Sequence, residues 1–120
     1  MKLLAAALAV SAPLVETAPL TPARCPAEAS NCAEVTGRVV YVEAVDPDGD
    51  GDLHVVATGA SLSLPGLTAV DVRPGLRPRR DPRIGDEITA AGPVYTGSYG
   101  QRQIQADRFA VRPDRGGTRR

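Results

Sequence analysis

Apolar and polar residues alternate along several short stretches of the chain, and glycine-containing turns separate these stretches. A period of two is typical of β-strands that bury one face, and it does not fit the spacing of an amphipathic helix. The pattern predicts strands at residues 34–45, 52–57, 67–73, 86–95 and 102–111. We therefore expect an all-β fold, and the length of the chain favours a single domain.

The segments between these strands carry residues that favour chain reversal. Asp46-Pro47-Asp48-Gly49-Asp50-Gly51 predicts a hairpin between the first two strands, and residues 97–100 predict another between the last two. Residues 74–82 contain Pro74, Pro78 and Pro82 without apolar periodicity, which indicates a loop rather than a helix.

Two local features indicate that the sheet curves. Gly37 interrupts the first strand, and a glycine inside a strand marks a bend or bulge of the kind that closes barrels. In the last strand the alternation slips near Asp107, because Ile104 and Phe109 differ in phase by one residue. A bulge at this position would restore the alternation.

Five strands in this order, with a glycine-bent first strand and a link after the third, resemble the OB-fold. The resemblance covers residues 34–112 and implies a five-stranded antiparallel OB-fold-like Greek-key barrel. An OB-fold usually has a helix between its third and fourth strands, whereas this chain has its proline- and arginine-rich loop there. We therefore expect one end of the barrel to be built differently.

Two short motifs are similar to those of small exported bacterial OB-fold-like proteins of unassigned role. Asp50-Gly51-Asp52-Leu53-His54 matches a D-G-D-x-H pattern on the first hairpin, and residues 100–104 match a G-x-x-x-I pattern at the last strand. Those proteins tend to carry H-G-W-x-E-I at the second place, where this chain has Tyr99-Gly100-Gln101. The resemblance implies that the protein is exported, but it does not identify a ligand.

The first residues are typical of a targeting segment. Met1-Lys2 is positively charged, residues 3–10 are apolar, and small residues near Ala18 resemble a cleavage site. This predicts a signal peptide over residues 1–18 and a secreted or periplasmic protein, with an uncleaved N-terminus as the alternative. Pro13 and Glu16 interrupt the apolar run well short of the ~20 residues that a spanning helix needs, so we expect no membrane span after signal cleavage.

Residues 19–33 form an N-terminal segment that contains both cysteines of the chain. In an exported protein we expect Cys25 and Cys32 to form a disulfide that ties this segment to the barrel. Metal binding is the weaker alternative, because the spacing of the two thiols does not match a zinc site and no histidine lies nearby. At the other end, residues 113–120 are polar and are predicted to be a disordered tail.

Charge is balanced overall but unevenly distributed. The chain carries 14 basic and 14 acidic residues, with an acidic stretch at 34–52 and basic stretches at 73–83 and 102–120. Such an arrangement creates local fields that the net charge hides. The first basic stretch contains Arg73, Arg77, Arg79, Arg80 and Arg83.

These arginines and the few aromatic residues are the candidate ligand contacts. Guanidinium groups bind phosphates, and aromatic rings stack on bases. We expect Tyr41 and Tyr95 to act with the arginine loop on an anionic or oligomeric ligand, such as single-stranded nucleic acid, an acidic polysaccharide or a peptide. Some aromatic residues should instead serve the core. The alternatives are arginines that only keep the loop soluble, and a structural or interaction protein of the cell envelope.

A weak calcium site is a further hypothesis. Asp46, Asp48 and Asp50, followed by Gly51, match the start of a D-x-D-x-D-G loop, in which carboxylates converge on one cation. The twelfth position of such a loop is Ala57 rather than an acidic residue. A plain acidic turn is therefore favoured, and no cofactor is expected beyond this possible calcium ion.

We expect no enzymatic activity. Asp50-Gly51-Asp52 resembles part of thermonuclease-like OB-folds, but Gly66 and Pro74 stand where the arginine and glutamate of those enzymes would fall. This leaves at most an inactive thermonuclease-like domain, because the charge stabilisation and the general base are missing. His54 is the sole histidine, and we expect it to pair with a carboxylate such as Asp52 rather than to catalyse.

Overall fold

The computed structural model describes residues 19–44 and 51–114. The predicted signal peptide, the aspartates of the first hairpin and residues 115–120 lie outside this part. Within it, six strands form one sheet. The elements are β1 (Cys32–Glu43), β2 (Leu53–Thr58), β3 (Leu67–Val72), the 3-10 turn η1 (Pro74–Leu76), β4 (Glu87–Thr96), β5 (Arg102–Gln105) and β6 (Arg108–Arg112).

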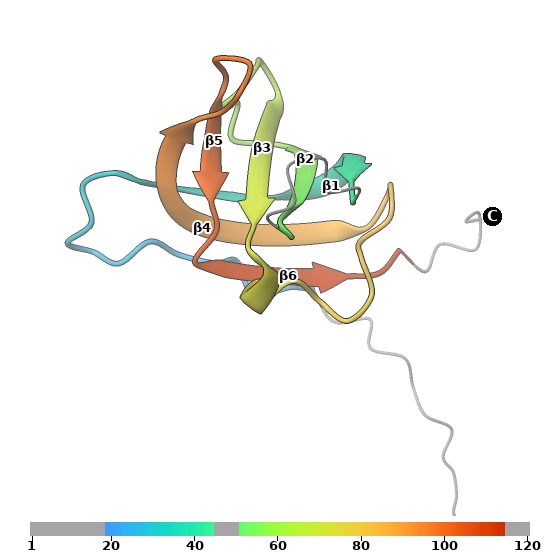
Figure 1. The fold of residues 1–120 in the computed structure, drawn as a ribbon. Helices are drawn as coiled ribbons and strands as arrows, with labels where there is room; N and C mark the ends of the chain where they lie inside the picture. Colours follow the sequence, from blue (N-terminus) through green and yellow to red (C-terminus); the bar gives the residue numbers. More distant parts are fainter. Residues whose placement is uncertain (1–18, 45–50, 115–120) are drawn as a thin grey trace, which may run out of the picture.

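The sheet closes in a ring. Its strand order is β1-β2-β3-β5-β4-β6, and β4 also pairs with β1. Figure 1 shows β4 as a strongly curved strand that begins beside β6 and ends beside β5. The predicted all-β fold is confirmed, and every predicted strand region contains a strand.

The prediction that all strand pairs are antiparallel is wrong for one pair. β3 and β5 run parallel, with Val70 opposite Ile104, while the other pairs are antiparallel. The reason is geometric. A closed ring of five strands has an odd number of neighbouring pairs, so strand direction cannot alternate all the way round. The parallel pair lies where the chain has already reversed direction through β4.

β1 takes part in both halves of the ring. Its first part pairs with β4 and its second part pairs with β2, and the register shifts between Val39 and Tyr41. Gly37 lies just before this shift, against β2. A Cβ at this position would overlap the carbonyl oxygen of Thr58, so only glycine allows the two backbones to approach this closely.

The last predicted strand is divided into β5 and β6. The break falls at Ala106 and Asp107, where the alternation was expected to slip. A bulge is not what resolves the slip. The N–H of Ala106 donates to the carbonyl of Asp71 (2.9 Å) and the N–H of Asp107 donates to that of Ala91 (2.8 Å). These bonds mark the point where the chain leaves β3 and continues beside β4 alone.

The core is built from small aliphatic side chains on alternate positions of the strands. Phe109 is the aromatic residue that packs against this core, and its side chain is only partly buried. The buried cluster consists of Val35, Val39, Leu53, Val55, Ala57, Val70, Val72, Ile88, Ala90, Ile104 and Ala106.

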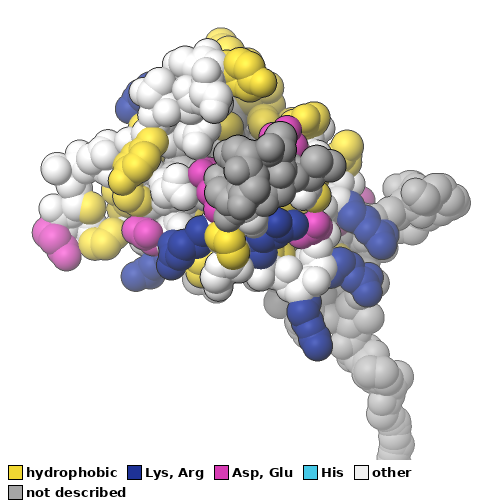
Figure 2. Space-filling model, viewed as in Figure 1, with side chains coloured by type: hydrophobic (Ala, Val, Ile, Leu, Met, Phe, Trp, Pro, Cys, Tyr) yellow, Lys and Arg dark blue, Asp and Glu magenta, His cyan; other side chains and the backbone are white. Residues whose placement is uncertain are grey.

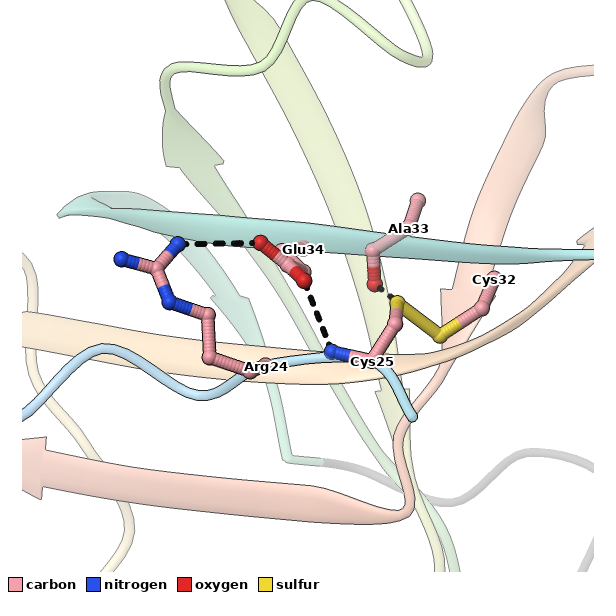
Figure 3. The surroundings of a disulfide bond; sticks show 5 residues. All are labelled: Arg24, Cys25, Cys32, Ala33 and Glu34. Atoms are coloured by element: carbon pink, nitrogen blue, oxygen red, sulfur yellow. Dashed lines mark hydrogen bonds and ion pairs between the residues drawn. A yellow bond between two sulfur atoms is a disulfide. The ribbon is translucent and has the colours of Figure 1, made fainter. Parts of the chain in front are cut away.

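An N-terminal arm, residues 19–31, precedes β1 and is tied to it. In Figure 1 it is the blue segment that loops out at the left of the view before it enters β1. The predicted disulfide between Cys25 and Cys32 is confirmed. Figure 3 shows Glu34 accepting hydrogen bonds from the backbone N–H of Cys25 (2.7 Å) and from Arg24 (3.2 Å). The N–H of Ala23 also donates to Thr89 on β4 (2.7 Å).

The other end of the described chain is also packed. Asp114 donates its backbone N–H to the carboxylate of the buried Asp86 (2.9 Å). Residues 113 and 114 belong to the predicted disordered tail, and in the structure Asp114 is hydrogen-bonded to the segment before β4.

Replacing Gly37 with alanine should destabilise the protein, because the new Cβ would push β1 away from the end of β2. Overpacked positions typically cost about 1–3 kcal/mol of unfolding free energy, and we expect the upper end of this range. Urea unfolding monitored by circular dichroism measures this loss of unfolding free energy. Gly75→Ala is the matched control, since its Cβ would meet no atom within 4 Å. Equal losses in both variants would contradict the role of Gly37 in closing the ring.

The attachment of the arm should weaken in acid. The N–H of Cys25, and then Arg24, lower the pKa of Glu34 below its ordinary value of 4.5. A lowered pKa means that this contribution to stability is present above the ordinary value and is lost as the pH falls through the folded-state value. The difference in Tm between wild type and Glu34→Gln should therefore shrink between about pH 6 and about pH 3.

Glu28→Gln serves as the control for this experiment, because Glu28 is exposed on the same disulfide loop. Its Tm should follow that of the wild type at each pH. A difference between wild type and Glu34→Gln that stays constant with pH would show that the carboxylate of Glu34 is not what holds the arm.

Candidate ligand-binding groove

One outer face of the ring carries a groove of about 710 Å³. It runs across the second part of β1, β2, β3, β5 and the end of β4, and the turn between β4 and β5 borders it. We call this surface the tyrosine groove. The residues used below are Tyr41, Glu43, His54, Asp71, Tyr95, Tyr99, Gln101, Gln103 and Gln105.

Strand pairing brings these side chains onto one surface. Side chains alternate between the two faces of a strand, so residues between core positions face outward. Tyr41 lies opposite Val56, and Glu43 lies opposite His54. Tyr95 lies opposite Gln103 on the far side of the groove. Residues from distant parts of the sequence therefore meet here.

All three tyrosines of the chain line this groove and none belongs to the core cluster. Tyr41 and Tyr95 are about half exposed, at 52% and 54%, and Tyr99 is 94% exposed. Of the aromatic residues expected to serve the core, only Phe109 packs against it, and valine, leucine, isoleucine and alanine fill the interior of the described chain. Rings held at a groove with open faces are available for stacking on a ligand.

The middle of the groove holds an acidic and imidazole cluster. His54 on β2 faces Asp71 on β3, with 3.6 Å between Nε2 and Oδ1. Glu43 is the neighbour of His54 on its other side. We expected Asp52 as the partner of His54, but directly paired residues on adjacent strands approach more closely than residues two apart on one strand.

Amide side chains border the groove along β5. Gln101 Nε2 donates to Gln103 Oε1 (3.2 Å), and Gln101 Oε1 accepts the backbone N–H of Tyr99 (3.0 Å). The N–H of Gly97 donates to the carbonyl of Gln101 (2.6 Å) and closes the turn. These bonds fix the turn that carries Tyr99.

The arginine loop lies apart from the tyrosines. None of the arginines of the described chain lines the tyrosine groove. Arg79, Arg80 and Arg83 border a separate hollow of about 370 Å³, which we call the arginine hollow. In Figure 2 basic side chains gather in the lower half of the view, at the level of β6 and η1, and the upper half over β3 and β5 is mostly uncharged.

Two arginines of the predicted ligand-binding set are engaged within the protein. Arg73 donates to the carbonyl of Ala106 (3.1 Å) and lies 3.8 Å from Asp107. Arg77 holds both carboxylate oxygens of Asp81 at 3.1 Å and donates to the carbonyl of Gly51 (2.8 Å). The predicted ligand-binding residues therefore fall into three groups. Tyr41 and Tyr95 line the tyrosine groove, Arg73 and Arg77 make contacts within the protein, and the remaining arginines border the arginine hollow.

Several groove residues were not singled out from the sequence, namely Glu43, Asp71, Gln103 and Gln105. The period-two pattern alone could have placed Glu43 on the same face as Tyr41. Asp71, Gln103 and Gln105 required knowledge of the β3–β5 pairing, which local sequence does not encode.

The calcium hypothesis concerns Asp46, Asp48 and Asp50, which lie outside the described residues. Elsewhere in the described chain, no group of three or more His, Cys, Asp or Glu side chains is placed to hold a metal ion. Nor does any helix in the described chain have the length and hydropathy needed to cross a membrane.

A scan against models of known protein families finds no match, and a search of curated proteins finds no similar sequence.

Proposed function

We propose that β1 to β5 form an OB-fold barrel, and that the protein is a non-enzymatic, exported module that binds an oligosaccharide in the tyrosine groove. The strand order β1-β2-β3-β5-β4, closed by the β1–β4 pair, supports this assignment of the fold. OB-folds bind oligonucleotides and oligosaccharides over strands 2 and 3 and beside the loop between strands 4 and 5. The tyrosine groove occupies the same place.

The observation that carries the proposal is the combination of side chains in the groove. Tyrosine rings offer large apolar faces, which pack against the C–H faces of sugar rings. Glutamine amides both donate and accept hydrogen bonds, and carboxylates accept them. Sugar hydroxyls need donors and acceptors side by side, as Gln103 and Gln105 on β5 and the half-buried Glu43 on β1 provide. Together these groups match a polyhydroxylated ligand.

Electrostatics argue against nucleic acid in this groove. Binding of single strands combines aromatic stacking with a positively charged path for the phosphates. Here the charged residues that line the described groove are Glu43 and Asp71, with His54 between them. Their carboxylates would repel phosphate groups. An uncharged glycan has no such cost, so its affinity should depend little on salt.

Export is proposed on two grounds. The disulfide of Cys25 and Cys32 suits an oxidising compartment, which the secreted and periplasmic environments provide. The first 18 residues have the composition of a signal peptide.

A second candidate is an envelope interaction protein that holds a peptide of a partner in the same groove. The observation in its favour is the pair of carboxylates, Glu43 and Asp71, which would attract lysine or arginine side chains. Such binding should weaken as salt is added, which distinguishes it from binding of a neutral glycan.

Calorimetric titration with neutral hexasaccharides (cellohexaose, maltohexaose and chitohexaose) tests the proposal. At least one hexasaccharide should bind. Tyr41→Ala and Tyr95→Ala should each lower the affinity for it about tenfold, equivalent to about 1.4 kcal/mol of binding free energy. Ile84→Ala is the matched control, because Ile84 is also exposed but lies outside the groove. It should bind like the wild type.

A single-stranded DNA dodecamer and a basic peptide serve as the competing ligands. Binding of the peptide alone, weakened by salt and by Glu43→Gln, would favour the interaction protein. Tight binding of DNA through the tyrosines, or hexasaccharide binding that both tyrosine variants leave unchanged, would contradict a glycan groove.

A further inference from the structure

The arginine hollow is formed by the loop between β3 and β4 together with the end of β6. Pro78, Arg79, Arg80, Pro82 and Arg83 come from the loop, and Val111 comes from β6. It shares no lining residue with the tyrosine groove. Its properties can therefore be considered separately from the proposed glycan site.

Three guanidinium groups at this hollow have no partner among residues 19–44 and 51–114. In the described chain, the side chains of Arg79, Arg80 and Arg83 form no hydrogen bond or ion pair, unlike those of Arg73 and Arg77. Each guanidinium presents five N–H donors in a planar fork that fits an oxyanion. Those donors point to water or to a ligand.

Three acidic residues line the hollow, namely Asp81, Asp86 and Asp114, and each has a partner within the protein. Asp81 is held by Arg77 through both carboxylate oxygens. Asp86 is buried, and its two oxygens accept the backbone N–H groups of Arg83 (2.8 Å) and Asp114 (2.9 Å). These carboxylates therefore hold the loop in place, and they do not neutralise the three arginines by direct pairing.

The backbone that presents the arginines is fixed in several places. Pro82 is buried, and Arg77 connects the loop to Gly51 through a 2.8 Å hydrogen bond. The N–H groups of Leu76 and Arg77 both donate to the carbonyl of Arg73, which forms η1. A loop fixed before binding loses less conformational entropy when a ligand arrives.

We propose that the arginine hollow is a binding site for a phosphate or sulfate group. Arginines pair with such oxyanions through two parallel hydrogen bonds, which are stronger than bonds between neutral groups. No aromatic ring of the described chain lines the hollow, so it offers no stacking surface for nucleic acid bases. The site therefore recognises the phosphate or sulfate group and makes no stacking contact with the rest of the ligand. That group can be a free ion or can repeat along a sulfated glycan.

Titration calorimetry with inorganic pyrophosphate and, separately, with a heparin hexasaccharide at about 20 mM NaCl tests the site. The variant is Arg79→Gln/Arg80→Gln. Its matched control is Arg102→Gln/Arg108→Gln, which removes the same charge from two exposed arginines outside the hollow. We expect the first variant to lose about tenfold or more in affinity and the control to lose less than about twofold.

The two probes separate the sources of the oxyanion. Pyrophosphate binding that depends on Arg79 and Arg80 identifies a site for the free ion, and binding of heparin alone identifies a site for a polymer. Equal losses in both variants, or no binding of either probe, would overturn the proposal. Tyr41→Ala should leave these affinities unchanged, so failure of this site and failure of the glycan groove are distinguishable.

Arg79→Lys/Arg80→Lys adds a test of geometry. It keeps the charge but removes the planar fork, so binding should fall between the wild type and the glutamine variant. Circular dichroism confirms that each variant is folded. Full retention of affinity by the lysine variant would show attraction by net charge and would contradict a built oxyanion site.

Discussion

The close approach of two backbones at Gly37 is the constraint on which the architecture depends. β1 must pair with β4 over its first half and with β2 over its second, and the carbonyl oxygen of Thr58 leaves no space for a side chain at the change of partner. Gly92 plays the same part on β4, against the carbonyl of Gln105. With these two glycines the sheet can curve enough to close.

Closure in turn determines what the outer face contains. Because the ring has five strands, one neighbouring pair must be parallel, and the topology assigns this to β3 and β5. Asp71 on β3 then lies beside Gln105 on β5. The amides of β5 and the cluster of Glu43, His54 and Asp71 on β1, β2 and β3 thus share one surface, although they lie far apart in the sequence. The tyrosine groove is a result of ring closure.

Local signals in the sequence were sufficient for much of the fold. Alternation located the strands, Gly37 indicated the bend, and the phase slip at Asp107 located the break between β5 and β6. The disulfide followed from the expected compartment. Each of these inferences needed only neighbouring residues or residue types.

The inferences that failed concern residues far apart in the sequence. Tyr41 and Arg79 were expected to act on one ligand, but strand order places them at different hollows. Whether an arginine is free or paired also depends on long-range contacts, as with Arg77 and the carbonyl of Gly51. Nothing in local composition separates Arg77 from Arg79.

The absence of aromatic residues from the fully buried core has an optical consequence. The chain contains no tryptophan, and its three tyrosines all stand at one groove. Near-ultraviolet emission of the folded protein therefore originates almost entirely from that surface. Quenching or enhancement of this emission reports on occupancy of the groove itself, without any introduced label, while the interior remains spectroscopically silent.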